Sequence, residues 1–155
     1  MIRLIVAVDN KNGIANENGI PWNLSSEKKY YRDKIKSAEI LMGAGVYKEL
    51  KQPANAHKNF VLTHKFVDKP GFYKVSNTKI FFEEHKDVWV IGGQSVYDLS
   101  IELADEIYIT RIDQDFKCTK FFPEIDSKFQ LVSRSPKFIE NNIDFYYEVY
   151  KKIDR

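Results

Sequence analysis

Glu27 has the residue type and the surroundings expected of a proton-transfer group. It ends a long segment, residues 9–27, which contains two Asn-Gly turns and then the apolar side chains of Ile20 and Trp22. A loop this long in a small domain is uncommon and usually has a function. The alternative is an ordinary surface loop, but such a loop seldom carries these apolar residues. A carboxyl group beside Trp and Ile is expected in an apolar cleft, where desolvation raises its pKa and suits it to handle a proton.

Two strand ends that contain glycine are candidates for binding a phosphate group. Gly43 and Gly45 follow one apolar segment, and Gly92 and Gly93 follow another. Glycine allows a ligand to approach the backbone closely, and the N–H groups at the start of a following helix attract anions. Glycine ends many strands, so the first pattern is weak on its own. In an open α/β sheet, the crevice beyond the strand ends is where ligands bind.

The elements that must position these groups follow from apolar periodicity and helix-start signals. We expect strands at residues 2–8, 38–43, 60–63, 72–75, 88–91 and 106–113. We expect helices at residues 25–36, 46–50, 78–85 and 94–102. Ser25 or Ser26 is expected to cap the first helix, and Asn77 or Thr78 the third. A strand that is apolar on both faces, such as the first, belongs in the middle of a sheet covered on both sides.

The C-terminal part has a different pattern, because residues 129–135 and 143–151 alternate between two faces. This period is typical of a half-exposed antiparallel hairpin. The predicted fold is therefore α/β, with a mixed, mostly parallel central sheet, helices on both faces and an antiparallel C-terminal hairpin. No linker or repeat divides residues 1–155, so we expect a single domain.

Composition excludes several classes of protein. A hydrophobic content of 43% is too high for a disordered chain. The 24 basic residues are scattered among 22 acidic ones, so the net charge of +2 predicts no nucleic-acid partner. No segment is long enough to span a membrane, and the apolar N-terminus is too short for a secretory signal. The single cysteine, Cys118, fits a reducing, cytoplasmic location, and we expect a monomer that holds no metal.

Two motifs resemble the signatures of a known family. The segment Asn-Gly-Ile-Pro-Trp-Asn-Leu at residues 18–24, followed by Glu27, resembles the substrate loop of the dihydrofolate reductase family. The segment Val-Trp-Val-Ile-Gly-Gly-Gln-Ser-Val-Tyr at residues 88–97 resembles that family's cofactor turn. Residues 104–111 and 121–123 follow in the family's order and at its spacing. The resemblance covers residues 1–152, and the two signatures together are specific.

The resemblance implies reduction of 7,8-dihydrofolate to 5,6,7,8-tetrahydrofolate, with hydride transfer from the nicotinamide of NADPH to pterin C6 and protonation at N5. It implies that Glu27 grips the pterin as a bidentate acceptor, that Thr110 supports Glu27, and that Trp22 helps to close the loop. The candidate substrate-binding residues are Ile5, Ala7, Lys28, Tyr31, Arg32, Leu50 and His57. The candidate cofactor-binding residues are Ala7, Ile14, Asn18, Ile20, Gly43, Ala44, Gly45, Val46, Thr63, His64, Lys65, Ile91, Gly92, Gly93, Gln94, Ser95, Val96 and Tyr97. A cis peptide bond between the two glycines of the cofactor turn is also implied.

Two of the cofactor positions depart from the family pattern. Ala44 and Val46 stand where the family usually has an Arg for the 2′-phosphate and a Thr for the pyrophosphate. His64 and Lys65 lie where another contact to the 2′-phosphate is common, so they can compensate. NADPH is the expected cofactor, and NADH is the alternative.

Two further departures concern the substrate and its loop. His57 stands where the family usually has an Arg that holds the glutamate tail of folate, and a neutral imidazole is no bidentate fork. Lys28 or Arg32 can take over that role, or the substrate lacks the tail. Thr119 and Lys120 stand where an Asp usually helps to hold the substrate loop, so weaker loop closure is expected.

Three interpretations follow from these motifs and departures. The first is a dihydrofolate reductase with rearranged phosphate and carboxylate contacts. The second is a nicotinamide-dependent reductase of a smaller pterin or a riboflavin-pathway pyrimidine, and the third is a dinucleotide-binding homologue without turnover. Glu27 favours the first, since the pyrimidine reductases of this fold have no acid at that position. The presence of Trp22, Glu27 and Thr110 together argues against the third.

Overall fold

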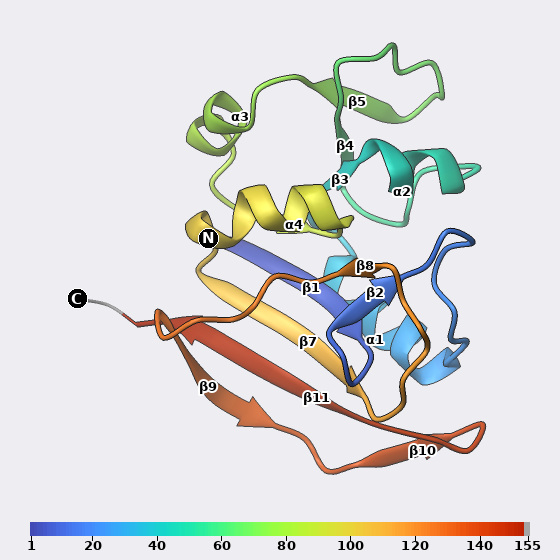
Figure 1. The fold of residues 1–155 in the computed structure, drawn as a ribbon. Coiled ribbons are helices and arrows are strands. Elements are labelled where there is room, and N and C mark those ends of the chain that lie inside the picture. Colours follow the sequence, from blue (N-terminus) through green and yellow to red (C-terminus); the bar gives the residue numbers. More distant parts are fainter. Residues whose placement is uncertain (154–155) are drawn as a thin grey trace.

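Strand β1 (Ile2–Val8) lies near the centre of a nine-stranded sheet in the computed structural model, which describes residues 1–153 (Figure 1). The other strands are β2 (Gly13–Ala15), β3 (Glu39–Gly43), β4 (Lys58–Leu62), β5 (Phe72–Val75), β6 (Val88–Val90), β7 (Glu106–Ile112), β8 (Lys120–Phe121), β9 (Phe129–Arg134), β10 (Phe138–Glu140) and β11 (Ile143–Lys152). The helices are α1 (Ser25–Ile35), α2 (Ala44–Glu49), α3 (Thr78–Glu84), α4 (Gln94–Ser100) and the short 3-10 helix η1 (Ile101–Leu103).

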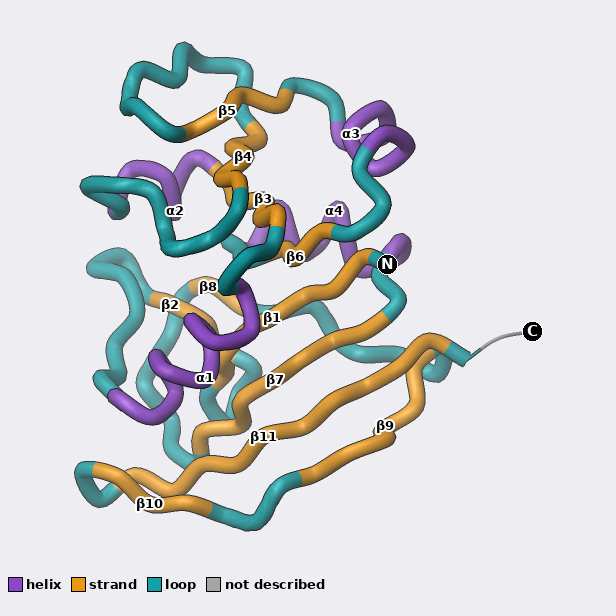
Figure 2. Tube along the Cα trace, turned by 180° about the vertical axis from the view of Figure 1, so that it is seen from behind, coloured by secondary structure: helices purple, strands orange, loops and turns teal. Residues whose placement is uncertain are grey.

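The sheet is parallel over most of its width. Its order is β10-β11-β7-β1-β6-β3-β4-β5, and β9 also pairs with β11. Every pair from β7 to β5 is parallel, whereas β11 runs antiparallel to β7, β9 and β10. Helices α1 and α2 cover one face and α3 and α4 cover the other, as two opposite views show (Figure 1, Figure 2). This architecture confirms the predicted fold class.

The two faces of the sheet have separate apolar cores. Val6 of β1 packs on the face of α3 and α4, in a cluster that includes Tyr97. Ile5 packs on the opposite face, in a cluster that includes Ile35 of α1. Successive side chains of a strand point to opposite faces, so Ala7 lies on the same face as Ile5. The first strand thereby supplies two residues to the floor beneath α1.

Helix starts and the shortest strands differ from the sequence prediction. Leu24 occupies the N-cap position of α1 and provides no side-chain cap, so the prediction that Ser25 or Ser26 caps this helix is wrong. Asn77 caps α3, since its side chain accepts a hydrogen bond from the Ile80 N–H at 3.0 Å. Strands β2, β8 and β10 were not predicted, because two or three residues are too few to show a period. Within residues 1–153, no helix has the length and apolar character needed to cross a bilayer.

The predicted C-terminal hairpin contains an additional strand. Both β9 and β10 pair with β11, so β10 forms the tight hairpin and β9 continues the same edge. The hairpin turn consists of Asn141 and Asn142, with φ angles of 52° and 62°. Two successive residues with positive φ are typical of a type I′ turn, whose twist matches that of the flanking strands. The turn therefore fixes the direction in which the end of β10 points.

Candidate active site

Glu27 lies in the first turn of α1, where its side chain is half-buried. Burial raises the pKa of this carboxyl group from its ordinary value to about 7, and the positive charge of Lys28 opposes the shift. The charged form of a carboxyl group loses solvation on burial, so the protonated form is favoured. Glu27 therefore exchanges a proton close to neutral pH, as its apolar sequence neighbours predicted.

Three tyrosines from three different elements surround Glu27. Tyr31 lies one turn along α1, Tyr97 is on α4 and Tyr147 is on β11. Burial raises the pKa of each tyrosine, and the nearby charge of Glu27 contributes to the increase in all three. The Tyr97 hydroxyl donates a 2.6 Å hydrogen bond to the backbone carbonyl of Ile5. These phenols stay protonated at neutral pH and leave Glu27 as the titrating group of the cluster.

The floor of the site is a row of residues across three adjacent strands. Ala7 of β1 pairs in register with Thr110 of β7, which pairs with Tyr147 of β11. Thr110 is only 2% exposed. Among the described residues, no hydrogen bond to Glu27 contributes to its pKa, so support by Thr110 stays a prediction. Sequence reasoning missed Tyr147, although its position on the same face as Phe145 in the alternating strand was a usable signal.

Trp22 packs the end of the long loop against the sheet. Its side chain is 5% exposed and meets the Phe116 ring edge-on at 5.3 Å. Leu24 belongs to the same apolar cluster, and Ala7 packs against it. In contrast, Ile20 is 64% exposed. The structure therefore buries Trp22 at the end of the loop and leaves Ile20 exposed, and closure of the loop over a ligand stays a prediction.

The beginning of the loop is held by the buried carboxylate of Asp9. One oxygen of Asp9 accepts hydrogen bonds from the N–H groups of Lys11 and Gly13, at 2.9 and 2.7 Å. The other oxygen accepts a 3.0 Å bond from the Phe116 N–H. Strand β2 then pairs with β8 in a separate two-stranded sheet, and the Thr119 N–H donates to the Ala15 carbonyl. The backbone thus connects these two segments, although Thr119 itself replaces the acid usual in the resembled family.

The glycine turn after β6 lies directly against the end of β3. The peptide bond between Gly92 and Gly93 is cis, and the Gly43 N–H donates a 2.7 Å hydrogen bond to the Gly92 carbonyl. A Cβ atom at Gly43 would lie 2.8 Å from a methyl carbon of Val96. At Gly92, where φ is +113°, it would lie 3.2 Å from the Tyr97 ring. Both positions require glycine, which creates a narrow backbone cradle between the two strands.

The remaining cofactor candidates extend from this cradle. Strands β3 and β4 are parallel and in register, so Ala44 and Thr63 leave the sheet at the same edge. His64 and Lys65 follow and are exposed. The other candidate positions differ in burial. Gly45 and Asn18 are exposed, Val46 is half-buried, and Ile14 and Val96 are buried. Ile91, Gln94 and Ser95 lie beside the turn. The side-chain carbonyl of Gln94 accepts a 2.7 Å bond from the Phe121 N–H, which joins the start of α4 to β8.

Sequence and fold both match one known family. A sequence model described as Dihydrofolate reductase matches residues 1–152 of this chain. The chain belongs to the dihydrofolate reductase family. This assignment confirms the predicted family and the predicted function, an NADPH-dependent oxidoreductase that reduces dihydrofolate.

Individual relatives agree with the family assignment. The dihydrofolate reductase of Aedes albopictus is 32% identical, in an alignment that covers 98% of this chain and 97% of that protein. The dihydrofolate reductase of Staphylococcus haemolyticus is 28% identical over 159 residues, which cover 98% of this chain and 96% of that protein. A solved structure of dihydrofolate reductase from Enterococcus faecalis, complexed with NADP(H) and RAB-propyl, has a TM-score of 0.89 and 26% identity, covering 99% of this chain and 97% of that one.

The residues predicted to hold the substrate tail of a dihydrofolate reductase differ in how far their side chains are already engaged by other residues. Leu50 packs with Tyr31 against the apolar cluster beneath α1 and α2. The side chains of His57 and Arg32 are exposed, and the backbone N–H of His57 donates a hydrogen bond to the Ala38 carbonyl. The ammonium group of Lys28 donates a 2.7 Å hydrogen bond to the Asn23 side chain. Of the two cations predicted to reach the tail, Lys28 is therefore less free than Arg32.

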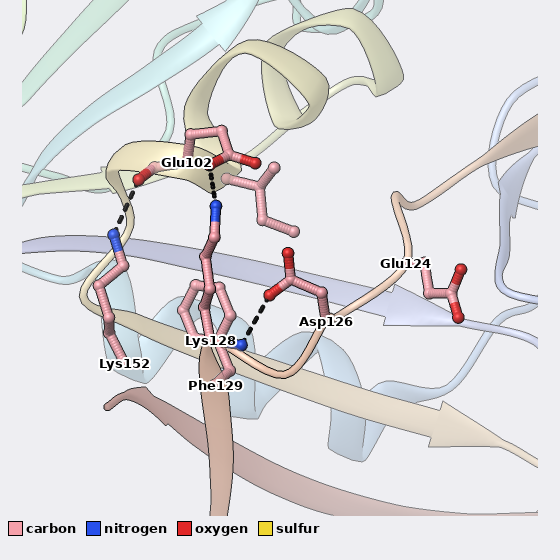
Figure 3. A pocket seen from close by; sticks show the side chains of 7 residues that line it. Glu102, Glu124, Asp126, Lys128, Phe129 and Lys152 are labelled. Atoms are coloured by element: carbon pink, nitrogen blue, oxygen red, sulfur yellow. Dashed lines mark hydrogen bonds and ion pairs between the residues drawn. The ribbon is translucent and has the colours of Figure 1, made fainter. Parts of the chain in front are cut away.

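The hollow shown in Figure 3 is separate from the dihydrofolate reductase site. It lies between η1 and β9, where hydrogen bonds join Glu102 to Lys128 and to Lys152. The Lys128 ammonium donates to the Glu102 carboxylate at 2.8 Å, and the Lys152 ammonium donates to the Glu102 carbonyl at 2.8 Å. Because these groups satisfy one another, this hollow offers little for a ligand to bind.

Proposed function

We propose that this protein reduces 7,8-dihydrofolate to 5,6,7,8-tetrahydrofolate at the site formed by α1, β1, β7 and the glycine turn. The observation that carries this proposal is Glu27, a half-buried carboxyl group with a pKa of about 7 above an apolar floor. Single-domain, monomeric organisation over residues 1–155 is part of the proposal. The single cysteine supports a reducing, cytoplasmic location.

The backbone cradle supports NADPH as the cofactor. A Cβ atom at Gly45 or Gly93 would meet nothing within 4 Å, so the backbone at these two positions borders open space that a pyrophosphate can approach closely. Thr63, His64 and Lys65 leave the adjacent strand at the same edge and can contact the nucleotide. When bound, NADPH supplies the hydride that the protein itself cannot provide.

The protein's own contribution is to hold the pterin and to manage one proton. Ionised Glu27 accepts two hydrogen bonds from the pterin ring, and such charge-assisted pairs fix orientation. Ile5 and Ala7 form the apolar floor, while Tyr31 and Leu50 flank the part of the substrate that points outward. Trp22 excludes water from the inner end of the loop. Because the pKa of Glu27 is near 7, the fraction of molecules in which the Glu27 carboxyl group is protonated grows as the pH falls through neutrality.

A direct assay tests the proposal. NADPH oxidation is followed on addition of 7,8-dihydrofolate, of a tail-less dihydropterin and of a riboflavin-pathway aminopyrimidine. Turnover is expected with both pterins and not with the pyrimidine. Turnover with the pyrimidine alone would establish the second interpretation, and the absence of turnover with every substrate would establish the third.

The cofactor contact at position 44 gives a prediction about nucleotide preference. Ala44 has no hydrogen-bond donor in its side chain, so the protein is expected to discriminate weakly between NADPH and NADH. An Arg–phosphate contact is a charge-assisted hydrogen bond worth about 1.5–3 kcal/mol, which corresponds to a tenfold or larger change in affinity. Ala44→Arg is therefore expected to tighten NADPH about tenfold and to leave NADH nearly unchanged. Fluorescence titration of both nucleotides measures this, with Ala44→Gln as the uncharged control. Equal tightening of both nucleotides would refute this placement of the 2′-phosphate.

The exposed His57 gives a prediction about the folate tail. His57→Arg is expected to lower the Michaelis constant for dihydrofolate about tenfold, because a guanidinium binds a carboxylate through two parallel hydrogen bonds. A tail-less dihydropterin should show no change. If Arg32 already holds the tail, Arg32→Ala raises the Michaelis constant for dihydrofolate alone, whereas Lys28→Ala has little effect. If the Michaelis constants of the two substrates change equally in every variant, the protein does not bind the glutamate tail.

A further inference from the structure

The first turn of α1 receives its cap from a distant part of the chain. The first N–H groups of a helix have no partner within the helix and are usually satisfied by a side chain at the N-cap. Here the N-cap residue is Leu24, whose side chain has no acceptor. The neighbouring Ser25 and Ser26 lie inside the helix and do not cap it. Another group must therefore accept these hydrogen bonds.

The carboxylate of Glu140, at the end of β10, occupies this place. Its Oε2 accepts hydrogen bonds from the N–H and the hydroxyl of Ser25, both at 2.7 Å. Its Oε1 accepts a bond from the Ser26 N–H at 3.1 Å. A negative charge at a helix N-terminus also interacts favourably with the helix dipole. One side chain, 115 residues away from Ser25 in sequence, thus satisfies both orphan N–H groups.

Two more contacts join the hairpin to α1 and its preceding loop. The side-chain amide of Asn141, in the type I′ turn after β10, donates to the Asn23 carbonyl at 3.1 Å. One turn further along α1, the Tyr30 ring stacks on Tyr147 of β11, with ring centroids 4.0 Å apart and planes 15° apart. Glu27 lies between these two attachment points. The hairpin therefore holds the helix on both sides of Glu27 along the chain.

We propose that Glu140 is a positioning residue of this enzyme: its carboxylate holds the first turn of α1 against the C-terminal hairpin and so fixes the Glu27 carboxyl group in its water-poor site. This inference rests on the proposed role of Glu27 in dihydrofolate reduction. Glu140 makes no contact with the reaction itself and acts only through the helix that it caps.

The charged and titratable groups around Glu27 determine the direction of the expected effect. Lys28 on α1 lowers its pKa, whereas burial raises it. The tyrosines of α1, α4 and β11 that face it stay neutral. Glu140 itself keeps its charge at neutral pH, because hydrogen bonds from Ser25 and Ser26 lower its pKa to about 2. Loss of Glu140 releases the first turn of α1 and lets water reach Glu27, and the restored solvation lowers the pKa of Glu27.

Direct titration of Glu27 tests this inference independently of turnover. The full chain is labelled with 13C at the glutamate side-chain carboxyl groups, and the Glu27 resonance is identified by its absence in Glu27→Gln. Glu140→Ala is expected to lower the Glu27 titration midpoint by about one pH unit, which cuts the protonated fraction at pH 7 about fivefold. The turnover number at pH 7 should fall by a similar factor, while the NADPH dissociation constant stays unchanged. Glu140→Gln keeps an acceptor oxygen without the charge and should give an intermediate midpoint.

Two control variants separate positioning from general stability. Glu124→Ala removes an exposed acid from a loop that does not touch α1. Asp33→Ala removes the surface ion pair between Lys29 and Asp33 on α1, without touching the cap. Neither should move the Glu27 midpoint.

An unchanged midpoint in Glu140→Ala, or an equal change in Asp33→Ala, would overturn the inference. If the wild-type protein reduces dihydrofolate but the Glu140→Ala midpoint is unchanged, the inference fails and the proposed function stands. If the midpoint falls but no wild-type turnover occurs, the positioning of Glu27 is supported and the proposed function fails.

Discussion

Glu27→Gln is expected to reduce dihydrofolate turnover at pH 7 by about two orders of magnitude, the usual contribution of a positioned acid or base. The amide cannot ionise, so it can neither grip the pterin through two acceptor oxygens nor exchange a proton. NADPH binding should stay near the wild-type level, because the glycine cradle lies on other strands. The measurement is steady-state turnover across a range of pH, with cofactor affinity determined separately.

The pH profile distinguishes this role from a purely structural one. Wild-type activity that depends on protonated Glu27 should fall as the pH rises through about 7. The Glu27→Gln enzyme should lose that transition and gain rate with acidity, as substrate becomes protonated in solution. The folded-state pKa is raised, so ionisation of Glu27 costs stability as the pH rises, and Glu27→Gln should be more stable than wild type at pH 8.

Glu17→Gln provides the matched control for this prediction. It is the same substitution at an exposed position of the same loop. Wild-type rates and an unaltered profile are expected. A Glu27→Gln enzyme that keeps wild-type turnover would remove Glu27 from the mechanism and with it the basis of the proposed function.

Of all the substitutions proposed for this protein, Glu148→Ala is expected to lower the free energy of unfolding the most. Glu148 is 1% exposed and accepts hydrogen bonds from Arg111 at 2.8 Å, Arg134 at 2.6 and 2.8 Å, and Tyr150 at 3.1 Å. Its removal leaves the Arg111 guanidinium, whose side chain is 25% exposed, without its acid. Breaking a buried ion pair in this way costs about 3–5 kcal/mol, and the upper part of that range assumes a partner more buried than Arg111. We expect a loss of about 3 kcal/mol in urea unfolding.

The control for this prediction is Arg134→Ala. The Arg134 side chain is 58% exposed, so its loss should cost less than about 1 kcal/mol. Equal losses in the two variants would contradict the ranking. Burial alone would raise the pKa of Glu148, but the hydrogen bonds from the two arginines outweigh it and lower the pKa. The stabilisation is therefore present above the ordinary carboxyl pKa and is lost as the pH falls through the lowered value, and Glu148→Ala should lack this acid-dependent part.

Features that depend on neighbouring residues could be predicted from the sequence. Glu27 follows its own apolar loop, and the glycines follow their own strands, so spacing alone identified both. Strand β1 was predicted over its whole length because every residue but one is apolar. The same local signals favoured Ser25 and Ser26 as caps, and there they failed, because a distant carboxylate is a stronger acceptor than a serine hydroxyl.

Features that depend on distant pairing could not be predicted in this way. Glu148 lies between the half-buried Tyr147 and Val149 in β11, and its sequence position gives no sign that it is buried until Arg111 and Arg134 are placed around it. The contact of Glu140 with α1 joins parts of the chain separated by more than a hundred residues. Tyr147 enters the site through its register with Thr110, which depends on the sheet order. Sequence reasoning therefore identified Glu27 as the candidate acid but not the residues that hold it.

The central place of β1 in the sheet has a consequence for how the protein is made. Strand β1 is synthesised long before its two partners, β6 and β7, so that Ile2 can pair with Val88, and Arg3 with Glu106, only after those later strands have been made. Pairings so distant in sequence make folding slow and leave apolar surface exposed in the meantime. A nascent chain halted before β7 is expected to depend on chaperones or to aggregate. Because the site also needs Tyr147, catalytic competence should appear only after β11 has left the ribosome.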